Sequence, residues 1–110
     1  MLTKETILRI HNRLDKSKMV NESALDFALS SQRETKDWLQ QLSYVIRAIL
    51  IDHVFADGNK RVTLALTIGV LEDLKFGYNA QKLENNIVKI LKENITNIRK
   101  IKKLIKDVIR

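Results

Sequence analysis

Residues 38–74 read WLQQLSYVIRAILIDHVFADGNKRVTLALTIGVLEDL, and this stretch decides the fold. In its first part, apolar residues recur at intervals of three and four, which is the spacing of one helix face. That face consists of Trp38, Leu42, Val45, Ile46, Ile49 and Leu50. We predict a helix over about residues 35–52, and the same spacing places His53 inward at the end of this face.

The second part of the stretch, residues 62–74, is apolar on nearly every side. A helix with so little polar surface belongs in the middle of a domain. We therefore expect a buried central helix that begins near Gly58 or Asn59, with Gly77 as its C-terminal cap.

Helical spacing extends from this stretch to both ends of the chain. The other expected helices cover about residues 3–15, 23–29, 79–93 and 95–110. Thr3 or Thr6 can cap the first of them, whose inner face would be Ile7, Ile10 and Leu14. No segment alternates apolar and polar residues as a strand does, and the chain has no proline. We predict an all-α bundle of five or six helices.

Size and composition favour a single domain that spans residues 1–110. With 45% apolar residues the chain can build one core, whereas two domains would each have too small a core. The absence of cysteine excludes disulfides and a thiolate zinc site. Because no run of about 18 apolar residues and no signal-peptide pattern occurs, we expect a cytoplasmic protein without a membrane span.

Residues 53–61 combine groups that suit a phosphate-containing ligand. The first N–H groups of a helix have no partner in the helix, and the helix dipole is positive at that end. Gly58 would let a phosphate approach the backbone, Asn59 can add an amide donor, and Lys60 and Arg61 add two cations. Cations at a helix start cost up to about 1 kcal/mol each, and a bound polyphosphate would remove that cost.

The same loop contains two groups suited to phosphate chemistry. Asp57 is its only carboxylate, and magnesium sites for phosphate transfer use one or two carboxylates together with the substrate phosphates. We expect Asp57 to bind Mg²⁺. His53 can accept a proton from a hydroxyl near neutral pH. Phe55, between them, is interpreted as a buried anchor of the loop.

The pattern His-x-Phe-x-Asp-Gly-Asn-Lys-Arg at residues 53–61 resembles the signature of the Fic/Doc superfamily. Ile10 with His11, and residues 23–25, are weaker points of likeness, and the resemblance covers about residues 3–78. It implies an all-helical fold with His53 as the base and Asp57 as the metal ligand. It also implies nucleotide phosphates held by Gly58, Asn59, Lys60 and Arg61. We expect His11 at a helix surface.

Two positions separate the branches of this superfamily. Members that transfer AMP usually have glycine and a second arginine where this chain has Lys60 and Leu64. The chain is therefore similar to the Doc (death on curing) branch. That branch implies a toxin kinase that transfers the γ-phosphate of ATP, or of another nucleoside triphosphate, to a target such as a translation elongation factor. A Fic-type nucleotidyltransferase is the alternative within the superfamily.

A regulatory pattern and a basic surface bear on the partners of the chain. Ser30 and Glu34 have the spacing of the family's inhibitory motif, but Thr35 follows where glycine or asparagine is expected, so we expect a separate antitoxin. The net charge of +7 fits an acidic partner. The basic face of the last helix consists of Arg99, Lys100, Lys102, Lys103, Lys106 and Arg110.

This basic face can be a solvated surface, an antitoxin contact or a nucleic-acid contact. A non-catalytic helical module that binds nucleic acid is therefore a functional alternative of another class. We do not expect nucleic acid as a partner, because only 5% of the residues are aromatic and base stacking needs aromatic side chains.

Overall fold

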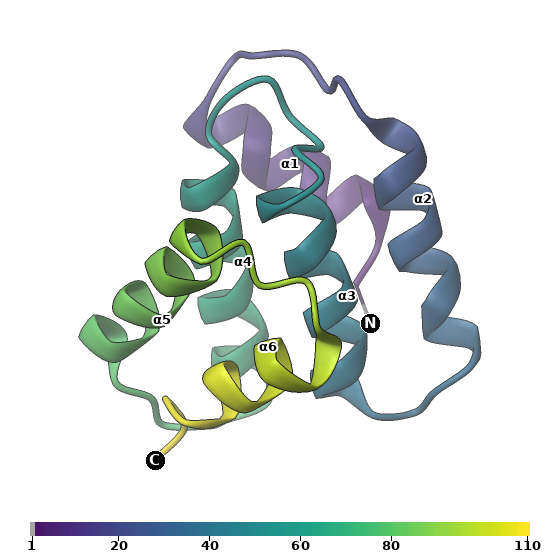
Figure 1. Ribbon diagram of the computed structural model, residues 1–110. Helices are drawn as coiled ribbons and strands as arrows, with labels where there is room; N and C mark the ends of the chain where they lie inside the picture. The colour runs from purple at the N-terminus through teal and green to yellow at the C-terminus, as the bar shows by residue number, and fades with distance from the viewer. Residues whose placement is uncertain (1) are drawn as a thin grey trace.

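The computed structural model describes residues 2–110, apart from the side chain of Gln32. Across these residues the chain forms six α-helices and one short 3₁₀ helix, without a β-strand (Figure 1). Their bounds are α1 Lys4–Leu14, α2 Glu22–Ser30, η1 Ser31–Arg33, α3 Trp38–Leu50, α4 Asn59–Asp73, α5 Ala80–Lys92 and α6 Ile98–Lys106. The prediction of an all-α bundle is confirmed.

Side-chain caps explain where several helices begin. The Thr3 hydroxyl accepts a hydrogen bond from Thr6 N–H, as the sequence predicted for α1. Asp37 accepts from two N–H groups of the first turn of α3, which therefore starts three residues later than expected. Asn79 and Asn97 cap α5 and α6 in the same way. Each such cap stabilises its helix by about 1 kcal/mol.

The centre of the bundle is α3, which packs against α2, α4 and α6. Its buried residues are Leu39, Leu42, Ser43, Val45, Ile46, Ala48, Ile49 and Leu50. The sequence favoured α4 for the central place, yet α4 leaves Leu64 and Ile68 half-buried and Gly69 exposed. α4 packs between α1, α3 and α5, and its buried face includes the polar residues Thr63 and Thr67.

The inner face of α1 differs from the predicted one. Ile7 is buried as expected, but Ile10 is half-buried and Leu14 is 37% exposed. His11 is only 2% exposed, so its expected place at the helix surface is wrong. The reason is a partner from another part of the chain, since the His11 ring stacks on the ring of Phe55.

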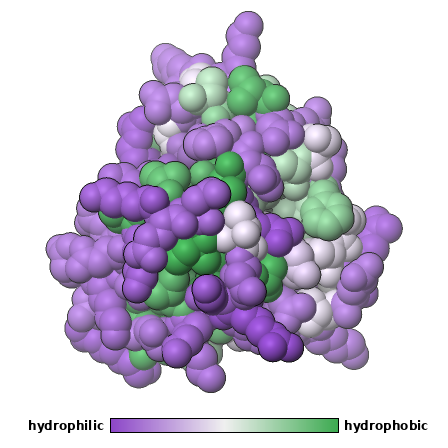
Figure 2. Space-filling view, in the orientation of Figure 1, coloured by the Kyte–Doolittle hydropathy of each residue, from purple (hydrophilic) through white to green (hydrophobic). Residues whose placement is uncertain are grey.

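The surface seen in Figure 2 is largely hydrophilic, with apolar atoms visible between α5 and α6.

Of the helices in the described part of the chain, none has both the length and the apolar character needed to cross a lipid bilayer.

Candidate functional site

The loop between α3 and α4 begins with a backbone conformation that the sequence did not predict. α3 ends at Leu50, and His53 lies outside the helix with a positive φ of 52°. The side chain of His53 is exposed, so the prediction that it continues the inward face of α3 is wrong. A left-handed conformation costs a residue with a side chain roughly 1–2 kcal/mol, and such strain concentrates at functional sites.

Asn59 closes the loop on itself. Its side-chain amide donates to the carbonyl oxygen of Phe55 at 2.8 Å, and its Oδ1 accepts from Phe55 N–H at 3.1 Å. Phe55 lies beneath the loop, 1% exposed. The side chain of Asn59 therefore shapes the loop, whereas the sequence interpretation used it as a phosphate donor.

A second segment of the chain lies alongside the loop. The Ala56 N–H donates to Lys18 O at 2.8 Å, and the Val20 and Asn21 N–H groups both donate to Val54 O. An isolated antiparallel bridge pairs Met19 with the loop. The sequence showed no strand pattern here, because these few bonds need no alternation of apolar and polar residues.

Gly58 is required for a reason other than the one expected. Its φ of 80° lies in the left-handed region, and a Cβ atom there would lie 3.0 Å from Cβ of Asp15. Its N–H donates to Oδ1 of Asp57 at 2.8 Å. Glycine therefore permits both the turn into α4 and the close approach of the end of α1.

We predict that Gly58→Ala lowers the free energy of unfolding by at least about 1–2 kcal/mol, because alanine must adopt the left-handed conformation. The contact with Asp15 adds to this loss. Gly69→Ala is the matched control, since Gly69 lies within α4 and a Cβ there has open space. That control should gain roughly 0.5–1 kcal/mol. Urea unfolding of both variants measures the difference, and equal effects would contradict this explanation.

The predicted site residues surround one cavity of about 550 Å³, a size typical of small-molecule sites. The cavity is lined by Leu50, His53, Ala56, Asp57, Gly58, Asn59, Lys60, Arg61 and Leu91. The structure thus brings His53 and Asp57 together at the start of α4. Sequence reasoning missed Leu91, because nothing local indicates that the end of α5 forms one wall.

The start of α4 offers the cavity backbone donors and cations. Within residues 2–110, no acceptor of the protein meets the N–H groups of Asn59, Lys60 and Arg61. Arg61 donates to Leu14 O at 3.1 Å and pairs with Asp15 at 2.8 Å. Among the same residues 2–110, no carboxylate pairs with Lys60. Free N–H groups beside a free ammonium group suit a phosphate.

Asp57 is suited to a metal ion only if the ligand supplies further oxygen atoms. Its side chain is exposed, and its contact within the protein is the bond from the Gly58 N–H. No three His, Cys, Asp or Glu side chains of the described residues gather into a metal site. One carboxylate with phosphate oxygens is a common arrangement for Mg²⁺, so the residues present fit a phosphate-bound ion.

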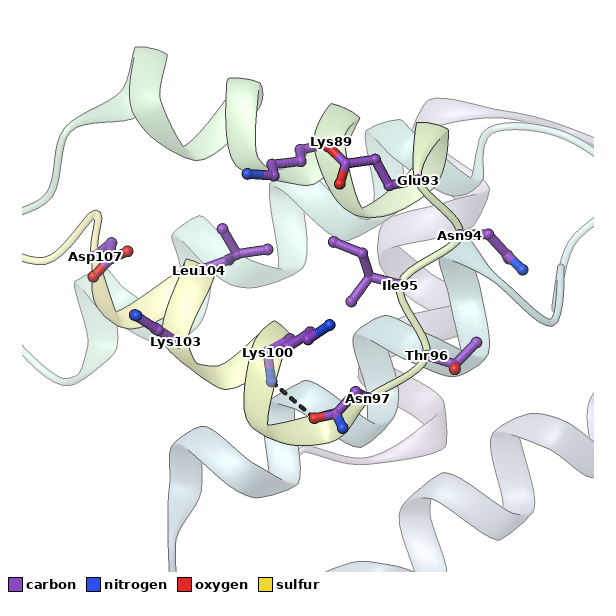
Figure 3. Close-up of a pocket in the computed structure, with 10 residues that line it drawn as sticks. All are labelled: Lys89, Glu93, Asn94, Ile95, Thr96, Asn97, Lys100, Lys103, Leu104 and Asp107. Atoms are coloured by element: carbon purple, nitrogen blue, oxygen red, sulfur yellow. Dashed lines mark hydrogen bonds between the residues drawn. The ribbon is translucent and has the colours of Figure 1, made fainter.

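A second cavity, of about 600 Å³, lies between α5 and α6 (Figure 3). Lys89, Lys100 and Lys103 line it together with the carboxylates of Glu93 and Asp107. This mixture of charges gives no convergent set of donors or acceptors. Lys102 on α6 pairs with Asp37, the residue that caps the start of α3. The basic face of α6 therefore also helps to attach this helix to the bundle.

Comparisons of this chain with protein-family models, with curated proteins and with solved structures find no match.

Proposed function

We propose that this chain is a phosphotransferase that moves the γ-phosphate of ATP, or of another nucleoside triphosphate, to a hydroxyl of a target protein. The observation that carries the proposal is the cavity at the start of α4. There His53, Asp57 and the residues whose N–H groups are unpaired line one space. This constellation supplies a base, a metal ligand and an anion site, which phosphate transfer requires.

The start of α4 would hold the phosphates. Its N–H groups and the Lys60 ammonium group donate to phosphate oxygens, and the bound charge offsets the unfavourable placement of cations at a helix start. Arg61 has guanidinium N–H groups beyond those bonded to Leu14 and Asp15, and these can point to the same anion.

His53 would act as the general base. Its exposure lets a hydroxyl of a second protein approach the imidazole. As the hydroxyl oxygen bonds to the γ-phosphorus, its proton passes to the imidazole and the bond to the β-phosphate oxygen breaks, which leaves the nucleoside diphosphate. Asp57 would hold Mg²⁺ together with the phosphates, and that ion neutralises phosphate charge when bound.

Two residues favour phosphate transfer over AMP transfer. Lys60 lines the cavity, so its long side chain occupies space that a glycine would leave to the nucleotide. Leu64 packs against the core and supplies no second cation. A Fic-type nucleotidyltransferase remains the alternative, since the same base and anion site could place the α-phosphate next to His53.

Labelled ATP separates these two reactions. We predict that the protein, incubated with Mg²⁺ and a bacterial extract, transfers label from [γ-³²P]ATP to a protein acceptor and not from [α-³²P]ATP. Label from the α position alone would refute the kinase and support the nucleotidyltransferase. Label from neither, combined with salt-dependent binding to DNA or RNA, would support the non-catalytic nucleic-acid module.

The resemblance to the Doc branch supports a wider role for this activity. In that role the chain is a cytoplasmic toxin, its target is a translation factor and a separate antitoxin restrains it. Loss of colony formation on expression, reversed by His53→Asn, is the result expected of such a toxin.

A further inference from the structure

We propose that His11 and Ser17 are positioning residues that hold the turn at Asp57 and Gly58 in the conformation that the cavity needs. The proposal concerns the ligand-free protein and goes beyond the proposed function. Only its affinity measurement depends on that function.

Ser17 holds Asp57 by both of its backbone groups. The Ser17 hydroxyl accepts from the Asp57 N–H at 3.1 Å and donates to the Asp57 carbonyl oxygen at 3.1 Å. The two residues are 40 positions apart in the chain. These bonds fix the peptide units on both sides of the Asp57 Cα atom, and therefore the direction in which its carboxylate leaves the backbone.

The single proton of the Ser17 hydroxyl determines whether His11 donates or accepts the hydrogen bond between these two side chains. Ser17 has one hydroxyl proton, and the Asp57 carbonyl oxygen accepts it. The imidazole Nε2, which lies 3.2 Å from the Ser17 oxygen, must then be the donor. An imidazole without a proton on Nε2 would compete for the hydroxyl proton and weaken the bond to Asp57.

His11 also contacts the loop at a second point. Its ring stacks on the ring of Phe55, with centroids 3.7 Å apart and planes within 6°. Because the imidazole is buried, water cannot replace its N–H once it is removed. His11 thus connects the anchor of the loop, Phe55, with the turn that presents Asp57.

The same segment also positions the positive side of the cavity. The Ser17 N–H donates to Oδ1 of Asp15 at 2.6 Å, and Oδ2 of that carboxylate binds Arg61 at 2.8 Å. Hydrogen bonding from Ser17 holds the pKa of Asp15 below its ordinary value, and the nearby Arg61 charge lowers it further. The segment that follows α1, residues 15–17, therefore orients both Asp57 and Arg61.

Paired variants separate the hydrogen bond from packing. His11→Phe keeps an aromatic ring against Phe55 but has no N–H, whereas His11→Gln places an amide N–H near the position of Nε2. Ser17→Ala removes the hydroxyl, and Ser17→Thr retains it. Ser30→Ala is the matched control, because among the described residues the Ser30 hydroxyl bonds to Phe27 O, within α2.

The decisive measurement is amide hydrogen exchange of the ligand-free protein, followed by NMR. His11→Phe and Ser17→Ala should speed exchange of the Asp57 amide by about tenfold, the effect of losing one hydrogen bond. Ser17→Thr, His11→Gln and Ser30→Ala should stay close to the unaltered protein. Unchanged exchange at Asp57, or exchange that rises equally at Asp57 and in α3, would overturn the proposal, since the second result means general destabilisation.

Affinity for Mg²⁺–ATP, measured by calorimetry, tests the link between the turn and the cavity. The Kd should rise about tenfold in His11→Phe, in proportion to the lost hydrogen bond, and recover in His11→Gln. Equal affinity of these two variants would refute that link. If the unaltered protein bound no nucleotide, the proposed function would fail, while the exchange measurement would still decide the roles of His11 and Ser17.

Discussion

Replacing His53 by asparagine is expected to reduce the proposed phosphate transfer by roughly 10²- to 10⁴-fold, because the reaction would lose its general base. Asparagine is chosen since His53 has a φ of 52°, and asparagine adopts the left-handed region more readily than most residues. The substitution therefore removes the imidazole with little effect on the backbone. Initial rates with [γ-³²P]ATP measure the loss.

The control for this prediction is nucleotide binding. His53→Asn should bind Mg²⁺–ATP with nearly the affinity of the unaltered protein, because the N–H groups and Lys60 at the start of α4 remain. Its circular dichroism spectrum should also be unchanged. Transfer at the original rate in a correctly folded variant would exclude His53 as the base.

The largest loss of stability is expected for Phe55→Ala. Phe55 is 1% exposed and stacks on His11, so its removal leaves a cavity beneath the loop. Truncating a buried phenylalanine in this way costs about 3–5 kcal/mol of unfolding free energy. Urea unfolding, followed by circular dichroism at the helix band, measures this difference.

Phe27→Ala is the matched control for Phe55→Ala, because Phe27 is 61% exposed on α2. Surface substitutions of this kind usually change stability by no more than about 0.5 kcal/mol. Similar losses in the two variants would show that Phe55 does not anchor the loop.

Local patterns in the sequence were sufficient for the approximate places of the helices and for the members of the site. The expected cap of α4 at Gly77 is wrong, since α4 ends at Asp73 with Leu74 as its cap. Thr3 caps the helix that it was expected to cap, since a side-chain cap and its N–H partner lie within one turn. The residues from Asp57 to Arg61 line one cavity because they are consecutive at a helix start. No contact between distant segments is needed for either inference.

The errors arose where distant parts of the chain meet or where a helix ends early. His53 was placed inward by a periodicity that stops at Leu50. His11 was expected at the surface because no neighbour in sequence indicates that Phe55 covers it. Ser17 was not considered at all, since its bonds to Asp57 join residues far apart in the chain.

The contacts between the end of α1 and the loop matter for anyone who wishes to graft this site onto another protein. A transplant of residues 53–61 alone would carry the side chains of the proposed site but leave behind the groups that contact them from residues 11–21. A host scaffold would also need an equivalent of residues 11–21, so the smallest transferable unit is two separate segments.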